Sequence, residues 1–134
     1  NLPAAQWSRL AAMLPAGASL ERHRHDLPGL MAAAAVSVSQ AGYNTVAEGL
    51  AGAARMVLVP FDAEGQDEQA ARAARLREAG LADLVTSAQL TPAGLAAAID
   101  RAAARPRPGT GGLRFDGAER SAEAIVERLG RHVG

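Results

Sequence analysis

Short apolar runs alternate with longer segments of helical periodicity along this chain, and this alternation restricts its possible folds most strongly. The run at residues 56–59 (MVLV) is apolar throughout and ends at Pro60, which is typical of a strand buried on both faces of a parallel sheet. Further strands are predicted at residues 18–23, 36–39 and 82–85. Strands that alternate with helices predict an α/β fold, in which a parallel sheet carries helices on both faces.

The predicted helices have recognisable start signals. Asp26 and Pro28 are typical of the N-cap and first turn of a helix that runs to residue 34, and Thr91-Pro92 begins a helix that runs to residue 104. The remaining helices are predicted at residues 4–14, 45–52, 67–80 and 121–132. The predicted order is therefore α-β-α-β-α-β-α-β-α-α.

Composition excludes several classes of protein. The 14 basic side chains, all Arg, balance 14 acidic ones, so the chain lacks the basic excess of a nucleic-acid binder. It has no Cys, which excludes disulfides and thiolate metal sites, and no apolar run reaches the roughly 20 residues of a membrane span. Residues 1–104 are predicted to form one domain and residues 105–134 a linker with a C-terminal helix. Because the first residue is Asn1 and not Met, we expect a piece of a longer protein.

The turn before the helix at residues 45–52 is the strongest candidate for a ligand site. In an open parallel sheet, ligands bind beyond the carboxyl ends of the strands, which here selects the predicted loops at residues 23–26, 39–44 and 60–69. In the second loop, Gly42 is free to take a positive φ and would point the N–H groups of a helix N-terminus at a phosphate. Glu48, one turn into that helix, could accept hydrogen bonds from both hydroxyls of a ribose.

Each candidate also has a purely structural interpretation. Thr45-x-x-Glu48 has the spacing of a capping box, in which Glu48 reaches back to the Thr45 N–H. Acidic residues at 67–68 would complement the dipole of the next helix, while Gln69 beside them could bond a sugar hydroxyl. Arg72, with the later arginines of that helix, is predicted to lie on its solvated face.

The loop at residues 23–26 brings two His and an Arg together. His23 and His25 alone are too few ligands for a metal, so we expect no metal site, whereas Arg24 could stack on or bond a base. Neither Ser37 nor Ser39 lies in a G-x-S-x-G elbow, so a hydrolase triad is not indicated.

Three segments together resemble the C-terminal domain of glycosyltransferase family 28. They are residues 37–48 (SVSQAGYNTVAE), 57–60 (VLVP) and 67–69 (DEQ). The family has a Ser-Gly-Ala-x-Thr-x-x-Glu segment, a strand that ends in Val-Pro, and a helix that opens with paired Gln or Glu-Gln. Residues 23–31 also match, and the resemblance covers roughly residues 18 to 86.

The resemblance implies the Rossmann-like, donor-binding C-terminal half of a two-domain GT-B glycosyltransferase. It implies inverting, metal-independent transfer from a UDP-sugar donor such as UDP-N-acetylglucosamine, with no further cofactor. The family's first two C-domain strands and the acceptor domain, which supplies the catalytic base, would precede Asn1. We therefore expect an isolated chain without turnover, in a cytoplasmic protein whose other half could contact the membrane peripherally.

Four matched positions lie around the predicted turn. Glu48 matches the glutamate that binds the ribose in this family. Gly42, Asn44 and Thr45 match the turn and helix N-terminus beside the diphosphate.

The remaining matched positions lie in the two flanking loops. Glu68 and Gln69 match the paired residues that hold the donor sugar, and Arg24 matches the position that faces the uracil ring. The chain departs from the family at Ala35, where an Asp is frequent, and at Arg72, where an Asn is frequent.

Two other functions share this architecture. A UDP-N-acetylglucosamine 2-epimerase would need acid–base groups around the sugar, for which Glu48, Glu68 and the two His of the first loop are the candidates. A non-catalytic donor-binding subunit would instead work with a partner chain.

Overall fold

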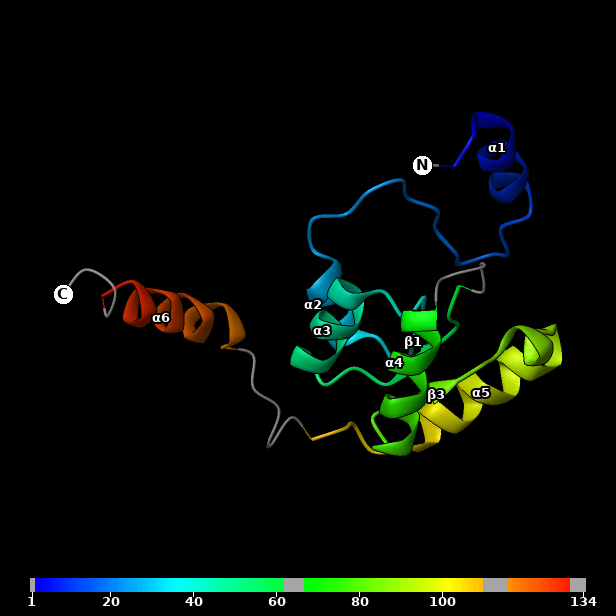
Figure 1. The fold of residues 1–134 in the computed structure, drawn as a ribbon. Helices are drawn as coiled ribbons and strands as arrows, with labels where there is room; N and C mark the ends of the chain where they lie inside the picture. Colours follow the sequence, from blue (N-terminus) through cyan, green and yellow to red (C-terminus); the bar gives the residue numbers. More distant parts are fainter. Residues whose placement is uncertain (1, 62–66, 110–115, 131–134) are drawn as a thin grey trace.

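A three-stranded parallel sheet lies at the centre of the fold (Figure 1). A computed structural model describes residues 2–61, 67–109 and 116–130 of the chain. The strands β1 (Ser37–Ser39), β2 (Met56–Leu58) and β3 (Ala82–Leu84) lie in the order β1-β2-β3, and Ser37 pairs with Met56 and Met56 with Ala82. The predicted parallel sheet is confirmed.

Helices cover both faces of this sheet. The helices α2 (Leu27–Ala33), α3 (Tyr43–Ala51) and α4 (Asp67–Glu78) pack with Met56 and Leu58 of β2 in one apolar cluster. The helix α5 (Pro92–Ala104) packs with Val57 in a second cluster. Successive side chains of a strand point to opposite faces, which explains why the all-apolar β2 is fully buried. The predicted α/β architecture is therefore confirmed.

Local start and stop signals define several of these helices. The Thr91 hydroxyl accepts a hydrogen bond from the Gly94 N–H at 3.0 Å, so the predicted N-cap of α5 is confirmed. After α4, Gly80 takes φ +70°, a conformation that favours glycine and ends the helix as predicted.

The structure corrects two predicted elements. Residues 18–23 form no strand, so the described chain has three strands and not four. Apolar and polar residues do alternate in this segment, but all of its residues except the half-buried Leu20 are exposed. Without a neighbouring strand, the segment cannot form the backbone hydrogen bonds of a sheet. The helix α6 (Gly117–Gly130) begins four residues before the predicted start, and its predicted end at residue 132 lies outside the described residues. A short 3-10 turn, η1 (Ser87–Gln89), was not predicted.

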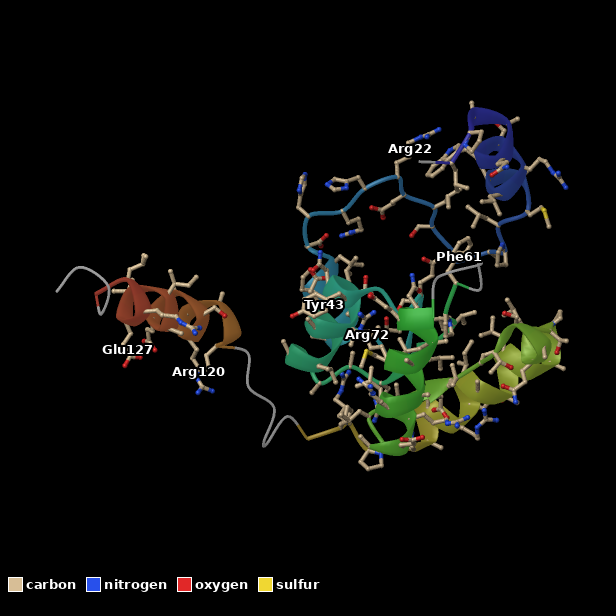
Figure 2. The ribbon with its side chains drawn as sticks, in the orientation of Figure 1. Arg22, Tyr43, Phe61, Arg72, Arg120 and Glu127 are labelled. Carbon is tan, nitrogen blue, oxygen red and sulfur yellow. The ribbon has the colours of Figure 1, made fainter. Side chains whose placement is uncertain are left out.

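Two helices stand apart from the sheet (Figure 1). The helix α1 (Ala4–Ala12) has no buried residue, and the Arg22 guanidinium lies 4.3 Å from the centre of its Trp7 ring (Figure 2). On α6, Ile125 and Val126 are exposed. Within the part of the chain that the structure describes, no helix is both long and apolar enough to span a membrane.

The segment after α5, predicted as a linker, is attached at its beginning to the amino ends of the strands. The Arg55 Nε donates to the Arg105 carbonyl at 2.6 Å, and Arg105 pairs with Asp83 of β3 at 2.6 Å. The Arg107 guanidinium donates to the Ala34 carbonyl at 3.0 Å. Residues 105–107 therefore extend the domain beyond α5.

Candidate functional site

The N-terminus of α3 opens at the carboxyl edge of the sheet, immediately after β1. Gly42 is its N-cap, with φ −62° and ψ 147°, and the Gly42 carbonyl accepts the first helical hydrogen bond, from the Val46 N–H at 3.0 Å. The N–H groups of residues 43–45 precede that bond and have no acceptor within the helix. No side chain of the described residues caps them. They therefore remain as donors for an anion, and the positive end of the helix dipole lies behind them.

Two predictions for this turn are wrong. Gly42 does not take a positive φ, and α3 begins two residues before the predicted Thr45. Thr45 is the third residue of the helix, so it cannot act as the N-cap of a Thr45-x-x-Glu48 capping box. Ala41 and Val46 are both buried in one core cluster, and α3 begins between them at Tyr43, so the turn is short and is packed at both ends.

Open space surrounds Gly42. Apart from Gly42 itself and its two chain neighbours, no described residue has an atom within 4 Å of a Cβ built at this position. Its backbone angles are ones that any residue adopts, so neither strain nor packing requires glycine here. The missing side chain leaves the backbone accessible, which is what close approach by a phosphate needs.

Glu48 lies one helical turn after Thr45. It is half-buried, and none of the described residues pairs with its carboxylate by a hydrogen bond or an ion pair. Side chains three positions apart lie on one side of a helix, so Thr45 and Glu48 face the same side of α3. The carboxylate is therefore available as a hydrogen-bond acceptor one turn from the anion-binding end.

The first turn of α4 contributes the second set of polar groups. The Gln69 Oε1 accepts a hydrogen bond from the Phe61 N–H at 3.2 Å, so Gln69 is bonded to the chain three residues after the end of β2. Glu68 instead lines an apolar groove between α3 and α4, together with Val46 and Leu50. The two neighbours thus make different contacts in the described chain, although they are adjacent in the first turn of α4.

Arg72 links α4 to the turn before α3. Its Nη1 donates to the Ala41 carbonyl at 2.7 Å, and its guanidinium carbon lies 5.7 Å from the centre of the Tyr43 ring. Figure 2 shows the two labelled side chains near one another, Tyr43 on α3 and Arg72 on α4. The prediction that Arg72 belongs to a solvated helix face is wrong, because helical spacing alone does not reveal a partner 31 residues away.

Arg24 lies in the exposed loop before α2. Its guanidinium bonds Glu21 at 2.8 Å and both carboxylate oxygens of Asp26, at 2.8 and 2.6 Å. The hydrogen bond from Arg24 lowers the pKa of Asp26. This pairing also explains why Asp26 occupies the predicted N-cap of α2 but makes no capping hydrogen bond.

Ser39 and the two His of the loop before α2 are the remaining polar candidates. The Ser39 Oγ at the end of β1 is buried without a hydrogen-bond partner among the described residues, although buried polar atoms usually have one. The rings of His23 and His25 pack edge to face, with centres 4.6 Å apart. No group of three or more His, Asp or Glu side chains in the described ranges is arranged to hold a metal ion.

Comparison with known proteins identifies the family. The profile described as "Glycosyltransferase family 28 C-terminal domain" matches residues 18–109. The chain belongs to this family. The resemblance carried by the three sequence segments is thereby confirmed.

Several bacterial transferases are similar to this family 28 domain. One is the UDP-N-acetylglucosamine--N-acetylmuramyl-(pentapeptide) pyrophosphoryl-undecaprenol N-acetylglucosamine transferase of Methylobacterium radiotolerans, which is 36% identical over 131 residues. That match covers 92% of this chain and 36% of the relative. A protein of the same name from Rhodopseudomonas palustris (strain BisB18) is 36% identical over 118 residues, covering 83% of this chain and 32% of the relative. The chain thus spans about a third of the length of these curated relatives, and no solved structure matches it.

The structure brings most of the predicted site residues of this family 28 domain to two adjoining helix ends. Gly42, Asn44, Thr45 and Glu48 belong to the N-cap and the first two turns of α3, and Glu68 and Gln69 to the first turn of α4. Arg24 makes its hydrogen bonds within its own loop and none to α3 or α4 in the described chain. Sequence reasoning missed Arg72 and Tyr43, which connect the two helix ends.

Proposed function

We propose that this family 28 domain binds the UDP-sugar donor of a glycosyltransferase, with the donor diphosphate at the N-terminus of α3. The observation that carries the proposal is the set of uncapped N–H groups at residues 43–45, which follow a glycine with open space around it. The names of the relatives support a UDP-N-acetylglucosamine donor. A nucleotide diphosphate is the ligand class that such a helix end binds well.

The rest of the donor would extend along the two helix ends. Glu48 would accept hydrogen bonds from the ribose hydroxyls, because its carboxylate has no partner in the described chain. Asn44 and Thr45 would flank the diphosphate. Gln69 would offer its amide N–H groups to the sugar, since its Oε1 is already bonded to the Phe61 N–H. Glu68 beside it would accept from a second sugar hydroxyl, and Arg24 would face the base.

The proposed reaction is an inverting displacement at the anomeric carbon. An acceptor hydroxyl would form its bond to that carbon as the bond to the diphosphate oxygen breaks, and its proton would pass to a base in a separate acceptor domain. UDP would leave with the bonding electron pair. The N–H groups at the start of α3 would stabilise the negative charge that develops on the diphosphate, the role that a metal ion has in other transferases.

Recognition of the ribose gives a sharp test. We expect UDP to bind the wild-type chain about tenfold more tightly than 2′-deoxy-UDP, since a hydrogen bond to a charged group contributes about 1.5–3 kcal/mol. Glu48→Gln removes the charge but keeps an acceptor oxygen, so it should weaken UDP binding and reduce this preference, as measured by NMR titration. Glu78→Gln is the matched control, because it removes the same charge at the exposed C-terminal end of α4. Equal binding of both nucleotides by the wild type would exclude the assigned role of Glu48.

A further inference from the structure

One helix bonds the described chain after both β1 and β2, at the carboxyl edge of the sheet. From the first turn of α4, Gln69 accepts a hydrogen bond from the Phe61 N–H of the loop after β2. Three residues later, Arg72 donates to the Ala41 carbonyl of the loop after β1. The two side chains lie on the same side of α4 by helical spacing. Phe61 and Ala41 are therefore bonded by side chains of a single helix.

The bond from Arg72 acts on the peptide that enters the turn. The Ala41 carbonyl and the Gly42 N–H belong to one planar trans peptide, so fixing the oxygen also fixes the direction of that N–H. Ala41 is completely buried, and the N···O distance of 2.7 Å is short, as expected of a charge-assisted hydrogen bond. Arg72 thus sets the orientation of the backbone just before the helix N-terminus.

The same guanidinium also contacts the residue after the turn. Tyr43 is 72% exposed, and its ring lies beside the Arg72 guanidinium at a distance typical of a cation–π contact. This contact joins the first residue of α3 to α4. Arg72 therefore contacts the turn on both sides of Gly42 (Figure 2).

We propose that Arg72 is a positioning residue that orients the turn before α3 for a nucleotide diphosphate and couples this turn to the sugar-binding end of α4. The inference rests on the proposed function, because it assigns Arg72 a role in the same site. Arg72 acts through the Ala41 carbonyl and the Tyr43 ring. Gln69 and Arg72 belong to one helix. A sugar that forms a hydrogen bond with Gln69 would therefore favour the position of α4 in which Arg72 orients the turn before α3.

The test compares Arg72→Met with Arg75→Met in the 134-residue chain. Both variants remove one positive charge from α4, and both residues line the groove between α3 and α4, but only Arg72 bonds the turn. We expect Arg72→Met to weaken UDP binding about tenfold and to shift the NMR signals of the ring of Tyr43, the only Tyr of the chain. Arg75→Met should stay within twofold of the wild type. Arg72→Lys, which keeps the charge and one donor, should restore most of the binding.

The outcomes separate this inference from the proposed function. If the wild type binds UDP and Arg72→Met binds it equally well, the inference is overturned and the proposed function stands. If the wild type shows no response to UDP, the proposed function fails and the inference fails with it. Urea unfolding shows whether each variant is folded. If Arg72→Met is not folded, Arg72→Gln takes its place, because it keeps a neutral donor for the Ala41 carbonyl. Arg72→Gln should bind UDP more weakly than Arg72→Lys, and equal binding by the two would overturn the inference.

Discussion

Replacing Gly42 with Ala should separate folding from ligand binding in this domain. The substitution adds one methyl group at a backbone position with φ −62° and ψ 147°, which alanine adopts without strain. Apart from residue 42 and its two chain neighbours, no described residue has an atom within 4 Å of the new carbon. The folded chain should therefore accept the methyl group, whereas a diphosphate at the N-terminus of α3 should not.

The expected magnitudes follow from two opposing effects on stability and one on binding. Fewer unfolded conformations should stabilise the variant by about 0.4–1 kcal/mol, and the poorer N-cap preference of alanine should cost a similar amount. The free energy of unfolding should thus change by less than about 0.5 kcal/mol. If the methyl group displaces the diphosphate from even one charge-assisted hydrogen bond, worth about 1.5–3 kcal/mol, UDP binding should weaken at least tenfold.

Urea unfolding and NMR titration with UDP provide the two measurements. Gly29→Ala is the matched control, because a Cβ at this position of α2 also meets open space. It should stabilise the chain by up to about 1 kcal/mol through helix propensity and leave UDP binding unchanged. Unchanged UDP binding in Gly42→Ala would refute the reasoning, as would a loss of stability well above 1 kcal/mol.

Three further predictions concern stability. Ala53 takes φ +50° directly after the C-cap of α3, a backbone conformation that is strained for alanine and not for glycine. Ala53→Gly should therefore stabilise the chain by about 0.5–1 kcal/mol in urea unfolding, and a loss of stability would contradict this explanation. Thr91→Ala should cost about 1 kcal/mol by the same assay, since it removes the side-chain cap of α5, whereas Thr91→Ser should cost little. The lowered pKa of Asp26 means that its pairing with Arg24 stabilises the fold above the unfolded-state pKa and is lost as the pH falls through the folded-state value. An NMR titration of the Asp26 carboxyl should show this pKa return toward its ordinary value in Arg24→Gln, and an unchanged pKa would argue against the pairing.

Elements whose signals are local could be predicted from the sequence. The all-apolar run of β2 indicates a buried central strand, whatever the positions of the neighbouring strands in the sequence. The Thr91-Pro92 pair defines the start of α5, because its capping hydrogen bond lies within one helical turn. The loops at the carboxyl edge follow from the parallel order of strands and helices alone. For this reason the helix ends that carry the candidate site were located correctly, to within two residues.

Features that depend on distant partners could not be predicted. Residues 18–23 alternate like a strand but have no neighbouring strand in the described chain, and the Asp26 carboxylate bonds Arg24 in preference to the helix N-terminus. Ala41, two residues before α3, is buried among residues from distant parts of the chain, and local sequence does not show such packing. Arg72 reaches across to α3 from a helix whose sequence, rich in Ala and Arg, carries no sign of that contact.

The proposed binding of a uridine diphosphate at the start of α3 is tested most directly by an NMR amide titration with UDP, using ADP and GDP as controls. The account predicts shifts concentrated at Gly42–Glu48 and around Gln69, larger with UDP than with either control, and reduced in Gly42→Ala. An absence of shifts at these amides, or shifts equally large with all three nucleotides, would contradict it.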